Sequence, residues 1–143
     1  MAVKPVPEGY HAITPYLTVS DLPRLVRFLI EAFDGKQIEG VPGASGEVTH
    51  AEVRIGDSMV MIGQARGEQT PRPATLYLYV EDCQAVYERA LAAGAKSLMR
   101  PARQFYGDIN GGVEDPLGNW WWIATRVEDV SAEELARRAR DRA

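Results

Sequence analysis

The sequence repeats itself with an offset of 61 residues, and this repeat restricts the folds that the chain can adopt. The segment YLTVSDLPRLVRFLIEA at 16–32 aligns with YLYVEDCQAVYERALAA at 77–93. In each copy, apolar residues first alternate with polar ones, as in a half-buried strand. Apolar residues at helical spacing follow, and Asp21 and Asp82 occupy the position of a helix N-cap. Each copy therefore predicts a strand followed by an amphipathic helix.

Three strand-like runs follow each predicted helix. They cover residues 36–42, 47–56 and 58–64 in the first copy and 95–103, 109–114 and 119–125 in the second. A Gly-Asp hairpin turn at 56–57 and an Asp-Pro-Leu-Gly turn at 115–118 separate the last two runs of each copy. The predicted fold class is α+β: two tandem βαβββ modules, at about 12–64 and 74–126, forming a curved mixed sheet in a single domain over residues 1–143.

The ends of the helices are marked by local signals. The two repeat helices should end near Gly35 and Gly94, because glycine commonly terminates a helix. The tail SAEELARRARDRA begins with a capping box, Ser131 with Glu134, and carries arginines toward its end. This pattern predicts a C-terminal helix over 131–142.

Charge and composition exclude several classes of protein. The net charge of −4 argues against nucleic acid as the main partner, because such proteins need a basic face. The sequence contains no apolar run long enough to span a membrane, and residues 1–10 lack the apolar core of a signal peptide, so we expect a cytoplasmic location. The single cysteine, Cys83, excludes an internal disulfide and a cysteine-based zinc cluster.

Several segments resemble a known family. They are ITPYLTVSD at 13–21, HAEVRIGDS at 50–58, YVEDCQAVYERALAAGAK at 79–96 and YGDINGGVEDPLGNWWWIAT at 106–125. With the duplicated βαβββ pattern, they resemble the vicinal oxygen chelate superfamily of glyoxalase I, fosfomycin and bleomycin resistance proteins and extradiol dioxygenases, and within it the PhnB-like branch. The resemblance implies that each half curls into a half-barrel. It also implies a homodimer in which both chains contribute to each cavity.

The resemblance also locates the positions that hold a metal ion in this superfamily, in the first and last strands of each repeat. They fall on Thr14, Met61, Thr75 and Trp122. Zinc, nickel, iron and manganese prefer imidazole and carboxylate ligands, and an indole offers no lone pair for coordination. We therefore expect no metal and no other cofactor, and the glyoxalase and dioxygenase activities do not carry over. Ile109 also stands where the PhnB-like branch commonly has arginine.

Strand alternation identifies the side chains that share a face with these positions. The face is rich in aromatic rings, hydroxyls and methionine: Thr14, Tyr16, Met59, Met61, Thr75, Tyr77, Tyr79, Trp120 and Trp122. Trp121 should instead point to the helices and belong to the core. Tyr106, on the loop before the seventh strand, is a further candidate. This composition predicts a protein that binds a flat aromatic or hydrophobic small molecule, with resistance by sequestration as a role.

Other interpretations stay open from the sequence. The aromatic side chains could simply fill the cavity, or they could be buried in a dimer interface. His50 and Glu52 share a strand face, so they could serve an enzyme of the same fold as unusual metal ligands or as acid and base. Such a pair can equally be a structural polar network. Asp108 could cap a turn or bind a hydroxyl group of a ligand, and the sequence favours the cap. We expect the Asn-Gly-Gly sequence at 110–112 to be flexible backbone.

Overall fold

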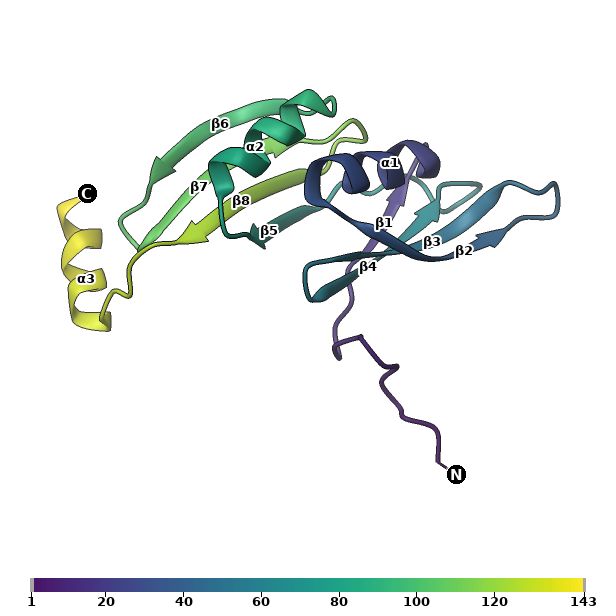
Figure 1. Cartoon of the computed structure of the whole chain (residues 1–143), viewed down its shortest axis with the longest axis horizontal. Helices are drawn as coiled ribbons and strands as arrows, with labels where there is room; N and C mark the ends of the chain where they lie inside the picture. Colours follow the sequence, from purple (N-terminus) through teal and green to yellow (C-terminus); the bar gives the residue numbers. More distant parts are fainter. Residues whose placement is uncertain (1, 143) are drawn as a thin grey trace.

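Both repeats fold into a four-stranded mixed sheet with one helix (Figure 1). The computed structural model describes residues 2–142, apart from the side chains of Glu39 and Val41. In chain order the elements are β1 (Tyr16–Val19), α1 (Leu22–Phe33), β2 (Lys36–Pro42), β3 (Val48–Ile55), β4 (Ser58–Gln64), β5 (Thr75–Tyr79), α2 (Cys83–Ala92), β6 (Lys96–Arg103), β7 (Asp108–Glu114), β8 (Trp120–Arg126) and α3 (Ala132–Asp141).

The two sheets have equivalent topology. Their strand orders are β1-β4-β3-β2 and β5-β8-β7-β6, and the first and fourth strands of each repeat are parallel. The α+β class and the tandem βαβββ pattern are therefore confirmed. The two halves form separate sheets that are not closed into a barrel.

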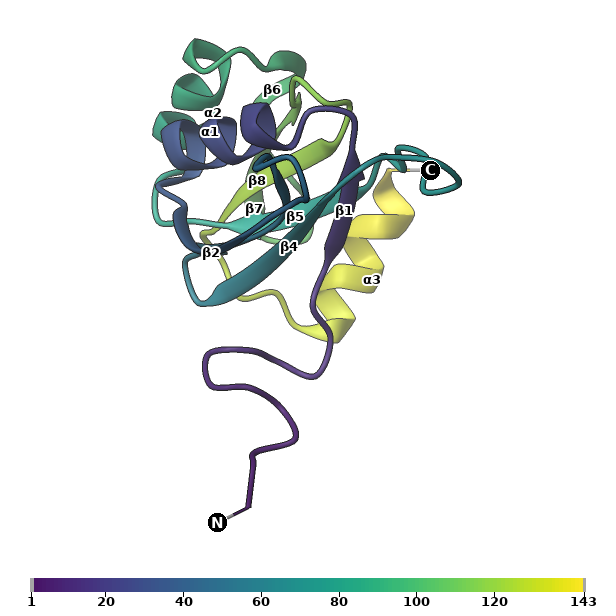
Figure 2. The same cartoon turned by 90° about the vertical axis from the view of Figure 1, so that its right-hand side faces the viewer.

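Helices α1 and α2 lie side by side over one face of the sheets (Figures 1 and 2). We call the opposite face the open face. It carries four aromatic side chains that are 43–58% exposed, namely Tyr16, Tyr77, Tyr79 and Trp120. Within residues 2–142, none of the helices combines the length and the apolar character needed to cross a bilayer.

The predicted helix caps are largely confirmed. Asp21 and Asp82 each accept a hydrogen bond from a backbone N–H in the first turn of α1 and α2, at 3.2 and 3.1 Å. Helix α2 ends next to Gly94, which has a φ of 110°. At the end of α1, however, the left-handed residue is Asp34, with a φ of 54°. Gly35 is required for close packing instead, because a Cβ there would lie 2.8 Å from a valine side chain of β3.

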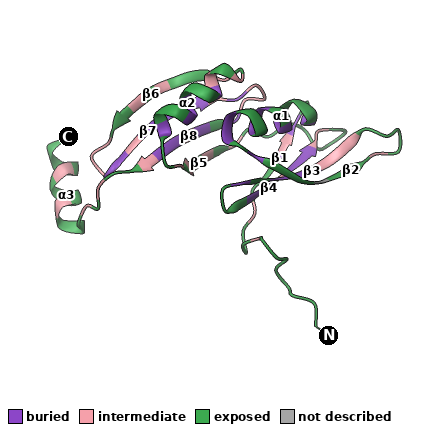
Figure 3. Ribbon diagram, in the orientation of Figure 1, coloured by how far each residue is buried: buried purple, intermediate pink, exposed green. Residues whose placement is uncertain are grey.

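The core lies between the helices and the sheets, where buried residues of both repeats meet (Figure 3). Leu29 of α1, Ile62 of β4 and Ile123 of β8 are completely buried. The ring of Phe33 in α1 lies 4.8 Å from the ring of Trp121 in β8, so the first repeat packs directly on the second. Trp121 is 2% exposed and faces the helices, as strand alternation predicts.

The carboxylate of Asp115 joins the turn between β7 and β8 to Trp121. Its Oδ1 accepts hydrogen bonds from the backbone N–H groups of Leu117 and Asn119, at 2.8 and 3.0 Å. Its Oδ2 accepts from Asn119 Nδ2 at 3.0 Å and from Trp121 Nε1 at 2.9 Å. A hydrogen bond of 3.0 Å from Gly118 N–H to the Asp115 carbonyl closes the predicted turn. One carboxylate thus supplies the partner that a buried indole requires.

Helix α3 has no buried residues and is held largely by charged side chains. Arg138 contacts Glu128 at 2.8 Å and Glu134 at 3.0 Å. Arg138 Nη1 also donates to the carbonyl of Phe105 at 3.0 Å, and the guanidinium of Arg142 lies 4.3 Å from the centre of the Phe105 ring. Helix α3 is therefore fastened to the loop before β7.

Acidification should loosen α3 by breaking its ion pairs with Glu128 and Glu134. Hydrogen bonds from arginine side chains of α3 hold the pKa of Glu128 and of Glu134 at about 2, against a usual 4.5. Because the folded-state pKa values are lowered, this stabilisation is complete above pH 4.5 and is lost as the pH falls toward about 2. We expect the ¹⁵N heteronuclear NOE of residues 132–141 to fall over this range, and Glu134→Gln to lower it already at neutral pH. Glu133→Gln, on the same turn, is the control. An NOE unaffected by acid would show that these carboxylates do not hold α3 in place.

Candidate functional site

Trp122 packs directly on Gly112 on the open face of the second sheet. The two residues are paired across β7 and β8, and a Cβ at position 112 would overlap the six-membered ring of the indole. Gly111, the residue before it, packs against Pro101: a Cβ on residue 111 would lie 2.9 Å from Pro101 Cγ. The expectation of flexible backbone at 110–112 is therefore wrong. These residues lie within a paired strand, and the glycines are needed for close approach rather than for flexibility.

A chain of hydrogen bonds runs beside Trp122. Tyr77 Oη and Tyr79 Oη both donate to Oδ2 of Asp108, at 2.6 and 2.8 Å. Asn110 Nδ2 donates to Tyr77 Oη at 2.9 Å and to Tyr106 Oη at 2.7 Å. Asp108 and Asn110 are buried, at 1% and 4% exposure, whereas the tyrosines reach the surface. The expectation that Asp108 caps a turn is also wrong, because it lies in β7 and accepts from two hydroxyls.

The carboxylate of Asp108 keeps its two tyrosine partners protonated. Burial and the hydrogen bond to Asp108 raise the pKa of Tyr77. The hydrogen bond to Asp108, followed by burial, raises the pKa of Tyr79. Ionising either phenol would bring a second negative charge next to the carboxylate. At neutral pH, both hydroxyls are therefore uncharged donors committed to Asp108, and Arg126 Nη1 lies 3.4 Å from its other oxygen.

Two hollows meet at Tyr77 of this hydrogen-bonded chain. The first, of about 360 Å³, is lined by Tyr77, Met99, Gln104, Tyr106, Asn110 and Trp122. We call it the Trp122 hollow. The second, of about 490 Å³, lies between the edge strands β1 and β5, where Tyr16, Thr75 and Tyr77 are among its lining residues. Tyr77 is common to both, and the volumes are within the range of small-molecule sites.

The structure brings together only part of the predicted site. Tyr77, Tyr106 and Trp122 share the Trp122 hollow, and Tyr16, Thr75 and Tyr77 share the neighbouring one. The five other predicted residues line neither hollow: Thr14, Met59, Met61, Tyr79 and Trp120. Tyr79 contributes through Asp108 and lines a separate surface hollow with Arg126.

The first repeat carries His50 and Glu52 at positions equivalent to those of Asn110 and Gly112. His50 is paired with Gly63 and Glu52 with Met61, as Asn110 is paired with Ala124 and Gly112 with Trp122. His50 Nε2 lies 3.4 Å from Glu52 Oε2, and the His50 ring is 5.7 Å from the ring of Tyr16. Among residues 2–142, no three His, Cys, Asp or Glu side chains converge as a metal site would require.

Three lining residues of the Trp122 hollow were not predicted as site residues, namely Met99, Gln104 and Asn110. Asn110 could have been found from alternation, because it shares a strand face with Gly112, the partner of Trp122. Met99 could not, because the pairing of β6 with β7 shifts register on both sides of it. Gln104 lies just beyond the end of β6, where no strand pattern applies.

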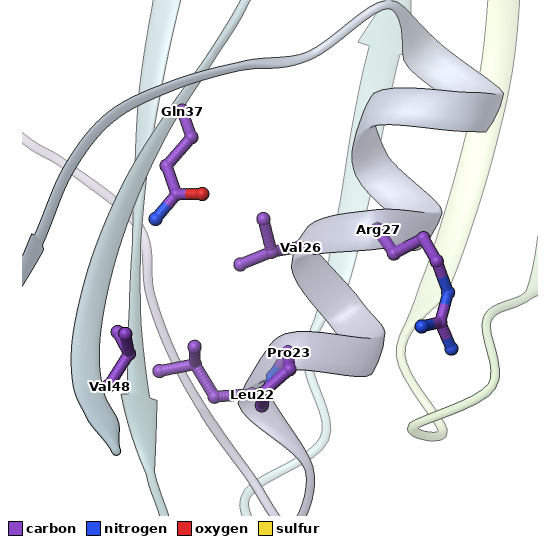
Figure 4. A pocket seen from close by; sticks show the side chains of 6 residues that line it. All are labelled: Leu22, Pro23, Val26, Arg27, Gln37 and Val48. Atoms are coloured by element: carbon purple, nitrogen blue, oxygen red, sulfur yellow. The ribbon is translucent and has the colours of Figure 1, made fainter. Parts of the chain in front are cut away.

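A further hollow of about 210 Å³ lies between α1 and strands β2 and β3 (Figure 4). Its walls are mainly aliphatic, with Arg27 and Gln37 at its edge, and the full set is Leu22, Pro23, Val26, Arg27, Gln37 and Val48. None of the predicted site residues lines it. The candidate site is therefore the open face of the second sheet.

Comparison with known families agrees with this architecture. The sequence model of the glyoxalase/bleomycin resistance protein/dioxygenase superfamily matches residues 9–123, which include both repeats up to β8. The chain belongs to this superfamily. The superfamily expected from the sequence motifs is thus confirmed.

Proteins from several bacteria have similar sequences or structures. The uncharacterized protein Rv0887c of Mycobacterium tuberculosis is 35% identical over 135 residues, covering 87% of this chain and 79% of that protein. TioX from Micromonospora sp. ML1 has a TM-score of 0.68 at 21% identity, covering 85% of this chain and 100% of TioX. A PhnB protein from Bacillus cereus has a TM-score of 0.64 at 20% identity, covering 80% and 99%. At these identities, the two structures support the superfamily fold only.

Proposed function

We propose that this protein binds a flat, largely apolar small molecule in the Trp122 hollow, without a metal ion. The packing of Trp122 on Gly112 is the observation that carries this proposal, because it fixes an aromatic ring at the wall of a hollow of suitable size. Tyr77 and Tyr106 supply further aromatic walls. Aromatic stacking adds about 0.5–1.5 kcal/mol per ring pair to the free energy gained from burying apolar surface.

The hydrogen-bonded chain supports this function by holding the site rigid before a ligand arrives. Tyr77 is fixed by both Asp108 and Asn110, and Tyr106 is fixed by Asn110. Side chains that are already ordered lose little conformational entropy on binding. Sequestration of a toxic aromatic compound is the biological role that we propose.

A second copy of the chain is proposed to cover the open face. Tyr16 and Tyr77 line one hollow, and the rings of Tyr77 and Tyr79 lie 5.2 Å apart. These three side chains are each 44–58% exposed in the single chain, and contiguous aromatic surface of this kind favours association. A homodimer would enclose both hollows that share Tyr77. Sedimentation equilibrium should therefore give twice the mass of 15.8 kDa, whereas a monomer at micromolar concentration would contradict this arrangement.

Equilibrium dialysis with naphthalene as the probe tests the proposed site. Trp122→Leu should weaken binding about tenfold, because it removes the ring on which the probe stacks. Trp120→Leu is the matched control, since Trp120 lies two positions away on the same strand and outside both hollows. It should change affinity less than about twofold. Equal losses in the two variants, or no loss in Trp122→Leu, would argue against the site.

A second candidate function is an enzyme that uses the first repeat. The contact of 3.4 Å between His50 and Glu52, beside Tyr16, favours it because this pair could exchange a proton with a bound molecule. Metal analysis of the purified protein decides whether a metal takes part. One transition metal ion per chain that is lost in His50→Ala would favour this enzyme over the metal-free binding protein.

A further inference from the structure

The hydrogen bonds beside Trp122 have a fixed direction. A carboxylate only accepts, so Tyr77 must give its single hydroxyl proton to Asp108 at 2.6 Å. Tyr77 Oη can then only accept from Asn110, which identifies the Asn110 atom facing it as Nδ2. The second proton of this amide nitrogen goes to Tyr106 Oη at 2.7 Å.

This direction makes Tyr106 an acceptor within the protein. The Tyr106 hydroxyl also lies near that of Tyr77 and helps to raise the pKa of Tyr77. Among the direct hydrogen bonds of residues 2–142, however, Tyr106 Oη only accepts, while its ring lines the Trp122 hollow. The loop that carries it is fastened on both sides, since Arg126 Nη1 donates to the Tyr106 carbonyl at 3.1 Å and α3 holds Phe105. The position of the Tyr106 hydroxyl is therefore fixed.

Trp122 provides a second donor of the same kind. Trp120 Nε1 is bound to Glu114 Oε1 at 3.0 Å and Trp121 Nε1 to Asp115 Oδ2 at 2.9 Å. Over residues 2–142, Trp122 Nε1 has no such partner, although its ring lines the same hollow. All six residues lining this hollow are uncharged. The hollow thus combines aromatic walls with unused neutral donors, and it lacks a charge to bind an ion.

We infer that the hydroxyl of Tyr106 determines ligand specificity by donating a hydrogen bond to a neutral acceptor on a flat ligand lying against Trp122. This inference rests on the proposed function and adds the chemical class of the ligand: a planar ring system that carries a ring nitrogen or a carbonyl oxygen at its edge. A planar hydrocarbon would fill the hollow but would leave the donor without a partner.

Quinoline and naphthalene test this inference, because they have the same shape and only quinoline carries a neutral acceptor at neutral pH. Equilibrium dialysis gives the affinity ratio of quinoline to naphthalene for the wild type and for Tyr106→Phe. We expect Tyr106→Phe to lower this ratio about fivefold, the effect of one hydrogen bond, through a loss of quinoline affinity alone. Tyr87→Phe removes a hydroxyl that pairs with Ser97 at 2.6 Å outside the hollow, and it should leave the ratio unchanged.

The possible results separate the two proposals. If Tyr106→Phe weakens both probes equally, or neither, then Tyr106 only shapes the hollow and the specificity inference is overturned while the proposed function stands. If neither probe binds the wild type better than Trp122→Leu, the proposed function fails and the inference fails with it. The unfolding midpoint of Tyr106→Phe, measured alongside, distinguishes a loss of binding from a loss of fold.

Discussion

Replacing Gly112 with alanine should abolish binding in the Trp122 hollow and destabilise the fold by about 1–3 kcal/mol. A Cβ at this position overlaps the indole ring, and the neighbouring atoms belong to a large, stiff side chain that cannot bend aside at its tip. The ring must rotate into the hollow or the pairing of β7 with β8 must open. Either change removes the surface on which the ligand is proposed to lie. Chemical denaturation and naphthalene dialysis measure the two effects.

A double-mutant cycle makes this prediction specific to the ring. In a Trp122→Leu background, Gly112→Ala should destabilise the protein much less, because the smaller side chain leaves room for the added methyl group. Additive effects of the two substitutions would contradict the claim that Gly112 is required by the ring of Trp122. In that case, Gly112 would be required only for the backbone conformation of β7.

Replacing Asp115 with alanine should destabilise the protein by about 3–4 kcal/mol, the largest stability effect that we expect from a polar substitution. Four hydrogen bonds end on this carboxylate. Its removal leaves two buried donors without partners, Asn119 Nδ2 and Trp121 Nε1, on residues that are 0% and 2% exposed. Each such donor contributes about 1–3 kcal/mol of desolvation penalty.

The hairpin turn of the first repeat provides the control for this prediction. Asp57 is exposed, and its side chain accepts a local hydrogen bond of 2.9 Å from Ser58. Asp57→Ala should change the free energy of unfolding by no more than about 0.5 kcal/mol. The loss of unfolding free energy in Asp115→Asn should lie between the losses in Asp57→Ala and Asp115→Ala, because an amide retains one acceptor oxygen. A loss below about 1 kcal/mol in Asp115→Ala would show that the turn is stable without its carboxylate.

The sequence repeat was sufficient to predict most of the fold. The six strands predicted after the two repeat helices are found within one residue of their expected bounds, since alternation, turn glycines and aspartate caps are local signals. Trp121 could be assigned to the core for the same reason. The first strand, however, begins only at Tyr16, so Thr14, which was expected on it, lies before the strand. At the end of α1 the prediction was incomplete. Asp34, not Gly35, adopts the left-handed conformation, which aspartate tolerates. Gly35 is needed because a larger residue would collide with β3.

The candidate site was less predictable, because it depends on contacts between distant strands. Alternation places Trp120 and Trp122 on one face, but it does not show that Trp120 binds Glu114 outside the hollows while Trp122 lines one. The role of Asp108 follows from the position of β5 beside β8, which brings two tyrosine hydroxyls to one oxygen atom. The two glycines after Asn110 resemble a flexible linker in sequence. Only the register with β8 shows that Gly112 lies opposite Trp122 and must lack a side chain.

The most direct test of the Trp122 site is a titration followed by the indole N–H signals of ¹⁵N-labelled protein. The chain has three tryptophans, so three signals are expected, and single Trp→Phe variants assign them. Addition of quinoline should shift the Trp122 signal most, move the Trp120 signal less and leave the signal of buried Trp121 in place. A Trp122 signal that stays fixed while quinoline binds, or a largest shift at Trp120 or Trp121, would contradict the account.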